Sequence, residues 1–190
     1  MLTTFINHIN SIYPVSPVLK EALERELEIV DYPTKHQLLR EGQRCDYVYV
    51  VLDGLLRSYY LKDDAEICSR FMPEQHIVIS VNSFYTRKPG YEYIETLEPS
   101  TLARIHYDRL QQLYKDHMEF NYITRILTEH YFTLSEQRLY LLRKQTAEER
   151  YRFFLDNYAP LMQRVPLKYI ATFLGMNLET LSRIRKKIAS

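Results

Sequence analysis

The chain has 190 residues, which suits one large domain or two small ones, and 46% of them are hydrophobic, ample for a buried core. It contains no apolar run long enough to span a bilayer, and its N-terminus lacks the regions of a signal peptide, so we expect a cytoplasmic protein without a membrane segment. The two cysteines, Cys45 and Cys68, form no metal-binding pattern, and the histidines show no paired spacing, so neither a metal nor a cofactor is expected.

The charge is unevenly distributed. The net charge is only +1, yet residues 161–190 carry six basic residues against one acidic residue, Glu179. Such a basic end is typical of a surface that meets a polyanion. The alternative is an ordinary solvated helix face.

The N-terminal part predicts a helix followed by strands. Ser16 can cap a helix over residues 16–29, Pro17 suits its first position, and leucines recur every fourth residue from Leu19 to Leu27. Residues 30–105 then read as short strands separated by turns, which indicates a sandwich, roll or barrel.

Turn residues divide this strand region. Asp53-Gly54, within YVYVVLDGLLRSYYL (47–61), predicts a hairpin, and a second turn is expected at 62–65. Two further strands, 91–97 and 101–105, are joined at 98–100. We expect a positive φ at every glycine, because each lies at a predicted turn; they are Gly42, Gly54, Gly90 and Gly175.

A long helix is predicted from about Asp116, after a short helix that begins at Tyr107. Its apolar residues form a seam with a seven-residue spacing, although His130 and Gln137 interrupt it. The seam residues are Phe120, Ile123, Leu127, Leu134 and Leu141. This pattern favours a homodimer interface. The alternative is a helix that packs on the sheet of its own domain.

The C-terminal part predicts a helix-turn-helix. Thr146-Ala147-Glu148-Glu149 is a capping box that starts one helix, and Pro160 ends it. Pro166 starts a second helix that runs to Leu174, and Gly175 makes the turn. Asn177 caps the last helix, from Leu178 to about Ile188.

The last helix has a polar face opposite its apolar stripe of Leu181 and Ile184. The candidate DNA-binding residues are Asn177, Glu179, Thr180, Arg183, Lys186 and Lys187. Glu accepts from a cytosine amino group and Arg binds guanine through two hydrogen bonds, whereas lysines near the helix end suit backbone phosphates.

The order of these parts resembles the Crp/Fnr family of bacterial transcription regulators. Two stretches carry the resemblance: YPTKHQLLREGQRCDYVYVVLDGLLRSYY (32–60) and LKYIATFLGMNLETLSRIRK (167–186). It implies an α+β fold with three parts: a cyclic-nucleotide-binding-like sensor β-roll with flanking helices (1–112), a dimerisation helix (113–145) and a DNA-binding helix-turn-helix (146–190). It also implies a homodimer on double-stranded DNA, contact with RNA polymerase and a small-molecule effector.

The sequence departs from that family in the effector cassette. Ile79-Ser80-Val81 stands where the family's nucleotide sensors have Gly-Glu-Leu, and Gly90-Tyr91 stands where they have Arg-Ser. The cyclic phosphate would lack its guanidinium, so cyclic AMP is not expected to bind. The candidate effector residues are Ser80, Arg87, Lys88, Gly90 and Tyr91. Arg87 and Lys88 serve either another anion or only the loop surface. The family's wing after the last helix is also expected to be incomplete.

Two functions stay open. One is a homodimeric, sequence-specific DNA-binding regulator. The alternative is an effector- or partner-binding roll that has lost DNA binding. An enzyme is not expected, because no nucleophile–base pair, metal cluster or phosphate loop has usable spacing.

Overall fold

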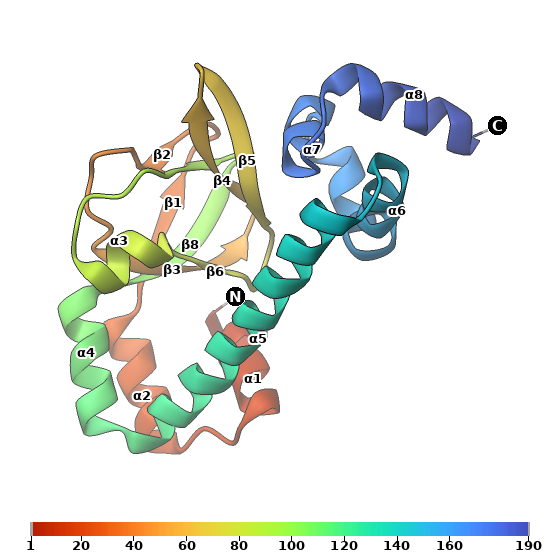
Figure 1. Ribbon diagram of the computed structural model, residues 1–190. Helices are drawn as coiled ribbons and strands as arrows, with labels where there is room; N and C mark the ends of the chain where they lie inside the picture. Colours follow the sequence, from red (N-terminus) through yellow and green to blue (C-terminus); the bar gives the residue numbers. More distant parts are fainter. Residues whose placement is uncertain (1, 190) are drawn as a thin grey trace. The chain divides into compact units, whose positions relative to one another are not determined.

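The structure, a computed structural model, describes residues 2–189 and divides into two compact units (Figure 1). The first unit comprises Met1–Ser58 and Phe71–Glu129, and the second comprises Tyr59–Arg70 and His130–Ser190. The three domain boundaries expected from the sequence remain a prediction. None of the described helices is long and apolar enough to cross a membrane.

Two four-stranded sheets form the predicted β-roll. In the first sheet the strand order is β1 (Glu28–Tyr32), β8 (Ser100–His106), β3 (Tyr47–Asp53) and β6 (Ile77–Val78). In the second it is β2 (Gln37–Leu39), β7 (Tyr93–Thr96), β4 (Leu56–Lys62) and β5 (Ala65–Met72). The first sheet is antiparallel, with Val50 opposite Ala103 and Val51 opposite Leu102 on β3 and β8.

The prediction of a hairpin at Asp53-Gly54 is wrong, because β3 and β4 belong to different sheets. Gly54 instead lets the chain cross from one sheet to the other. Its φ is +101°, and a Cβ there would lie 2.3 Å from Ser100 Oγ and 2.8 Å from the Pro99 carbonyl oxygen. The hairpin is the next one along, β4–β5, whose turn residues Asp63 and Asp64 have φ of 50° and 61°.

Three of the four glycines have the predicted positive φ, but Gly90 does not. Glycine at position 90 instead lets the backbone pass close to Ser83, since a Cβ at Gly90 would lie 3.0 Å from Ser83 Cβ. The predicted positive φ is therefore confirmed at Gly42, Gly54 and Gly175.

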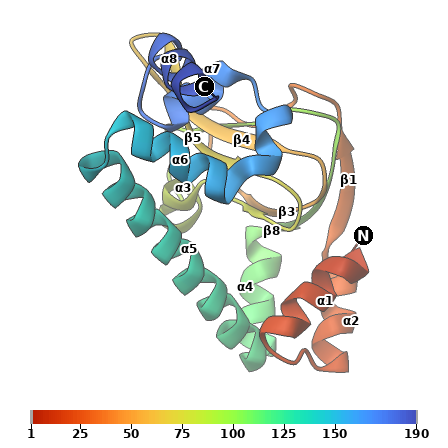
Figure 2. The same ribbon diagram turned by 90° about the vertical axis from the view of Figure 1, so that its right-hand side faces the viewer.

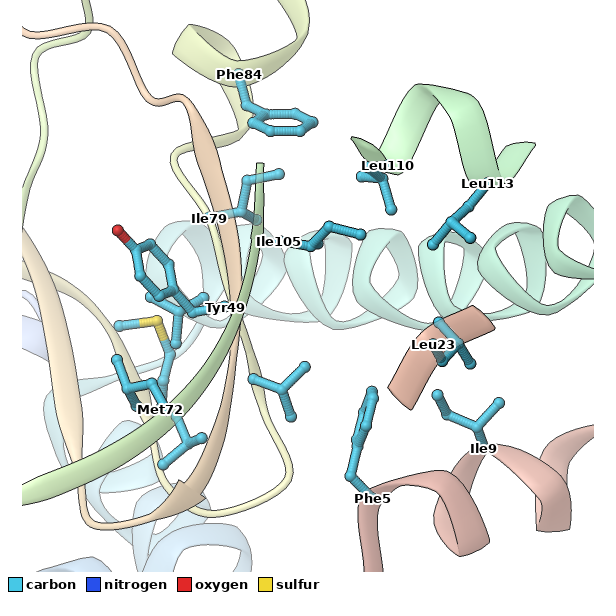
Figure 3. Packing of buried hydrophobic residues seen from close by; sticks show 14 of the residues in the cluster. Phe5, Ile9, Leu23, Tyr49, Met72, Ile79, Phe84, Ile105, Leu110 and Leu113 are labelled. Carbon is cyan, nitrogen blue, oxygen red and sulfur yellow. The ribbon is translucent and has the colours of Figure 1, made fainter. Parts of the chain in front are cut away.

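Four helices belong to the first unit: α1 (Leu2–Ile12), α2 (Pro17–Glu26), α3 (Val81–Thr86) and α4 (Tyr107–Asp116). Ser16 caps α2, since its Oγ accepts from the Leu19 amide at 3.2 Å. This helix ends earlier than predicted because β1 begins at Glu28, and neither α1 nor α3 was predicted. Figure 3 shows side chains of α1, α2 and α4 gathered with those of the roll in one apolar core.

The long helix α5 (Met118–Lys144) runs through both units. The second unit continues with α6 (Ala147–Tyr158), a short 3₁₀ helix η1 (Ala159–Gln163), α7 (Leu167–Phe173) and α8 (Leu178–Ala189). The capping box at Thr146 and Glu149 is present as predicted. Pro166 is the residue before α7 rather than its first.

Candidate nucleic-acid interface

The turn between α7 and α8 is closed by backbone hydrogen bonds. Gly175 has a φ of +63°. Its N–H donates to the Thr172 carbonyl at 3.0 Å, and the Met176 N–H donates to the Ala171 carbonyl at 3.0 Å. This pair of bonds is a Schellman motif, which ends α7 and satisfies its last carbonyls. The predicted helix-turn-helix is therefore present, and Figure 2 shows α7 and α8 side by side.

The packing of the two helices fixes which face of α8 looks outward. Ile170 and Leu174 of α7 and Leu181 of α8 are completely buried. Asn177 caps α8, because its Oδ1 accepts from the Thr180 amide at 2.8 Å. The apolar stripe of α8 thus faces α7, and its polar face points away from that contact.

The polar face is open for a partner. The side chains of Glu179 and Arg183 are 84% and 82% exposed, and their charged groups lie 3.9 Å apart. Asn177 and Lys186 are also exposed, and Thr180 is half-buried. A glutamate and an arginine one turn apart on a protruding helix can read base edges in a major groove.

Lys187 is already bound to a carboxylate of the same chain. Its Nζ donates to Glu148 Oε2 on α6 at 2.7 Å. Glu148 also accepts from Arg152 at 3.0 Å. These two hydrogen bonds, first the one from Lys187, hold the pKa of Glu148 below its usual value. The sequence identified Glu148 only as part of a capping box, because nothing local links it to a residue 39 positions later.

A hollow of about 460 Å³ lies beside the C-terminal half of α8. Two cations, Arg185 and Lys186, and two hydroxyl groups, those of Tyr151 and Ser182, line it together with Ile188. Because Lys186 lies in this hollow beside a second cation, it remains a candidate for contact with a DNA phosphate.

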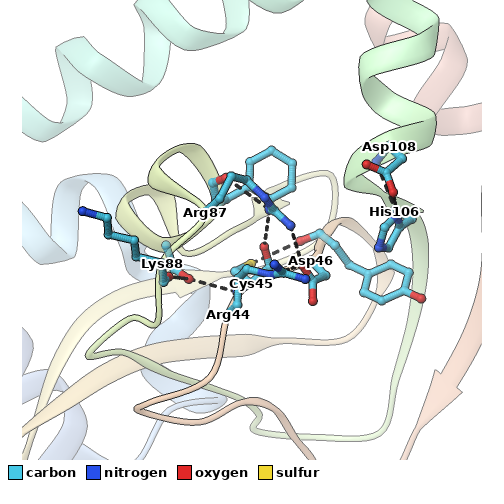
Figure 4. Close-up of polar contacts among 10 residues, drawn as sticks. Arg44, Cys45, Asp46, Arg87, Lys88, His106 and Asp108 are labelled. Atoms are coloured by element: carbon cyan, nitrogen blue, oxygen red, sulfur yellow. Dashed lines mark hydrogen bonds and ion pairs between the residues drawn. The ribbon is translucent and has the colours of Figure 1, made fainter.

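The first unit contains a second hollow, of about 610 Å³, at the roll. Its lining includes the apolar residues Leu38, Leu39 and Ile94 and the phenol-bearing Tyr47 and Tyr49. Three charged residues also line it, and Figure 4 shows them clustered: Arg44, Asp46 and Arg87. Burial raises the pKa of Tyr49, so its phenol stays protonated.

Arg87 is not the loop-surface charge that one alternative expected. Its Nη1 donates to the carbonyls of Cys45 at 3.0 Å and Phe84 at 3.2 Å, and its Nη2 donates to Asp46. The guanidinium also lies 3.8 Å from the centroid of the Tyr107 ring. Burial alone would raise the pKa of Asp46, but hydrogen bonds from Arg44 and Arg87 outweigh it and hold that pKa below its usual value. An anionic ligand at Arg87 would have to compete with this carboxylate.

The other predicted effector residues do not line this hollow. Ser80 is buried, and its Oγ donates to Glu92 at 2.7 Å. The Gly90 N–H donates to the Gln43 carbonyl at 3.0 Å, while Lys88 and Tyr91 are exposed. Only Arg87 of the five therefore reaches the hollow. The sequence missed the other lining residues, which lie between Leu38 and Tyr49, because the resemblance carried by residues 32–60 predicted the roll and assigned no ligand contact within it.

The predicted dimer seam faces the chain's own core. Phe120, Ile123 and Leu141 are 6%, 0% and 3% exposed, and Leu127 packs against the core of the first unit. Phe120, Ile123 and Leu141 therefore leave little surface for a second chain, whereas Leu127 is half-buried, and the dimer interface stays a prediction. Leu134 is 37% exposed. A seven-residue spacing alone does not say which neighbour the seam meets.

The opposite face of α5 carries exposed apolar side chains. At 3.6 residues per turn these residues fall within roughly 100° of one another around the helix. They are Met118, Tyr122, Phe132, Leu139 and Tyr140. Charged residues alternate with them, among them Arg125 and Glu129, which form an ion pair at 2.6 Å.

The described part of the chain contains no candidate metal-binding site. Within residues 2–189, no three His, Cys, Asp or Glu residues are grouped so that they would hold an ion. Both cysteines are buried and unbridged, and burial raises the pKa of the Cys45 thiol.

Comparisons with known proteins agree with this architecture. Residues 29–117 match the family described as "Cyclic nucleotide-binding domain". The transcriptional activatory protein AadR of Rhodopseudomonas palustris is 25% identical over 92% of this chain and 76% of its own. The transcriptional activator protein Anr of Pseudomonas protegens is 25% identical over 77% of this chain and 64% of its own.

Solved structures show the same fold. The c-di-GMP responsive global regulator CLP of Xanthomonas campestris superposes with a TM-score of 0.75 at 19% identity, covering 92% of both chains. FixK2 of Bradyrhizobium japonicum superposes with a TM-score of 0.74 at 19% identity, and the match covers 86% of this chain and 84% of the FixK2 chain. The predicted α+β fold is thereby confirmed.

Proposed function

We propose that this chain, a divergent relative of the Crp/Fnr transcription regulators, is a cytoplasmic, homodimeric regulator that reads double-stranded DNA through α8. The observation that carries the proposal is the open polar face of α8, presented by a Schellman turn and backed by fully buried apolar contacts. A short turn that contains glycine, between two helices that pack on each other, is typical of a helix-turn-helix, whose second helix enters the major groove.

Base reading is assigned to Glu179 and Arg183, and phosphate contact to Lys186. Among the residues that the structure describes, Arg183 has one charged neighbour, the exposed carboxylate of Glu179 at 3.9 Å, so it can leave Glu179 for a guanine at little cost. Asn177 is committed to its cap and contributes mainly by ordering the first turn of α8.

Dimerisation is assigned to the exposed apolar face of α5, Met118 to Tyr140, rather than to its buried seam. A two-fold axis along α5 would present two copies of α8 to a palindromic site, with half-sites about one helical turn apart.

The hollow in the roll is proposed as the sensing site. Its apolar lining residues, and its arginines that already pair with Asp46, suit a largely apolar small molecule more than a nucleotide. The chemistry of the lining therefore supports an effector other than cyclic AMP.

Selection of binding sites from random duplexes tests the proposal, and we expect an enriched palindrome. Arg183→Ala should lose about 1–3 kcal/mol at that site and relax the preference at one base position. Arg109→Ala, an equal charge change on α4 of the first unit, is the control and should bind with the preference of the wild type. If no sequence is enriched, and Arg183→Ala binds bulk DNA as the wild type does, the chain is instead a binding roll that has lost DNA recognition.

A further inference from the structure

Arg138 on α5 is a cation in the second unit, and no carboxylate of the described residues pairs with it. The titratable groups that face it are Cys68, Tyr158, Tyr60 and Arg70. Burial lowers the pKa of its guanidinium, and its Nη1 atom is out of reach of solvent and has no hydrogen-bond partner among the described residues. Exposed surface is available elsewhere on α5, so a half-buried arginine with a fully buried Nη1 at this position calls for a reason.

The bonds of Arg138 suggest that reason. Its Nη2 donates to the Phe173 carbonyl at 2.9 Å and to the Cys68 carbonyl at 3.4 Å. Its guanidinium also lies 3.7 Å from the centroid of the Phe173 ring. Phe173 is the last residue of α7, where a cation interacts favourably with the helix dipole.

Cys68 brings a third segment to the same point. It lies on β5, in the part of the β4–β5 hairpin that clusters with the second unit. Its N–H donates to Thr172 Oγ1 on α7 at 3.2 Å. One side chain of α5 therefore ties together α5, the end of α7 and a hairpin whose strands continue into the roll.

The energetics favour a positioning role over a stabilising one. Burying a charge among neutral partners is costly, and an apolar side chain of similar length usually packs there without loss of stability. What an apolar side chain cannot do is fix direction, because dispersion contacts tolerate small rotations that a forked donor does not.

We infer that Arg138 is a positioning residue that sets the angle between α5 and the helix-turn-helix, and so the distance between the two copies of α8 in the dimer. The inference rests on the proposed function. Arg138 touches no base or phosphate in this assignment. It acts through α7, by holding Phe173 against the helix that joins the two protomers.

The test measures binding to palindromes with different half-site spacing. The wild type should prefer the selected spacing sharply over sites one base pair shorter or longer. Arg138→Met should bind the selected palindrome about tenfold more weakly, the loss expected for charge-assisted hydrogen bonds, and should discriminate less between spacings. Its binding to a single half-site and its salt dependence should match the wild type.

Two further variants make the result decisive. Arg143→Met removes an exposed arginine from the last turn of the same helix and should leave the spacing preference intact. Arg138→Lys keeps the charge but not the fork, so it should behave like Arg138→Met. If Arg138→Met keeps the sharp spacing preference, or if Arg143→Met relaxes it equally, the inference is wrong while the proposed function stands.

Hydrogen exchange gives a readout that does not depend on DNA. In Arg138→Met, the Cys68 amide should exchange faster, while the amides that close the turn, Gly175 and Met176, should stay as protected as in the wild type. Unchanged exchange at Cys68 would contradict the tie between the hairpin and α7. Loss of protection at Gly175 would show that Arg138 merely keeps the helix-turn-helix folded. If the wild type selects no palindrome at all, it is the proposed function that fails.

Discussion

Lys187, near the end of α8, donates to Glu148 at the beginning of α6 across 2.7 Å, so a cation of the proposed DNA-reading helix is held by the protein's own carboxylate. The low pKa of Glu148 keeps it charged at neutral pH. A DNA phosphate that approaches Lys187 must displace this carboxylate, which therefore weakens the contact.

Glu148→Gln should accordingly tighten binding to all DNA sequences alike and make the slope of log affinity against log salt steeper by up to about one unit. Fluorescence anisotropy over a salt series measures both quantities. Asp156→Asn is the control, because it makes the same charge change on the same helix, and Asp156 pairs with no described side chain of α8. Equal effects of the two variants would mean that only the overall charge matters.

The lowered pKa of Glu148 determines how the difference in DNA affinity between Glu148→Gln and the wild type depends on pH. A carboxyl whose folded pKa lies below its unfolded value contributes its ion pair above the usual value of 4.5, and loses it as the pH falls through the folded value. The ratio of affinities of Glu148→Gln and wild type should therefore stay constant between about pH 6 and 8. A ratio that changes within this window would assign the titration to another group.

Cyclic AMP should not bind to the roll with micromolar affinity. Gly90 supplies no charge for the phosphate, and Arg87 is bound to Asp46 and to two carbonyls. Titration calorimetry tests this directly. If saturable binding did appear, Arg87→Met would show whether Arg87 had left Asp46 to take the anchoring role.

Dimers should dissociate when charge is placed on the exposed face of α5. Phe132→Glu combined with Leu139→Glu should give monomers in sedimentation at micromolar concentration, because like charges would face each other across the axis. Leu134→Glu lies on the opposite face of α5 and should remain dimeric. Dissociation by Leu134→Glu alone would restore the seam that the sequence predicted.

Gly54→Ala should destabilise the first unit strongly. The new Cβ meets backbone and side-chain atoms at 2.3–2.8 Å, and the φ of +101° is strained for alanine, so we expect a loss of more than about 2 kcal/mol. Gly42→Ala is the matched control, since Gly42 has a φ of +80° with nothing within 4 Å, and should lose about 1 kcal/mol. Urea unfolding of both variants measures the difference. Equal losses would mean that the crossing at Gly54 is not tightly packed.

The features that the sequence determined by itself are local ones. The Ser16 cap, the Thr146–Glu149 capping box, the turn at Gly175 and the Asn177 cap all depend on residues within a few positions of each other. Their chemistry is complete in a short peptide, so the pattern of residue types was sufficient.

Only the tertiary structure decided which partners meet across long distances. The turn at Asp53-Gly54 connects strands of two different sheets, and the apolar seam of α5 packs against the core of the same chain. Three cations donate hydrogen bonds to partners 35–42 residues away: Arg87, Lys187 and Arg138. A turn sequence favours a bend but does not choose the strand's partner, and an apolar stripe demands burial without naming what covers it. A cation likewise needs an acceptor, and the fold alone determines which one lies within reach.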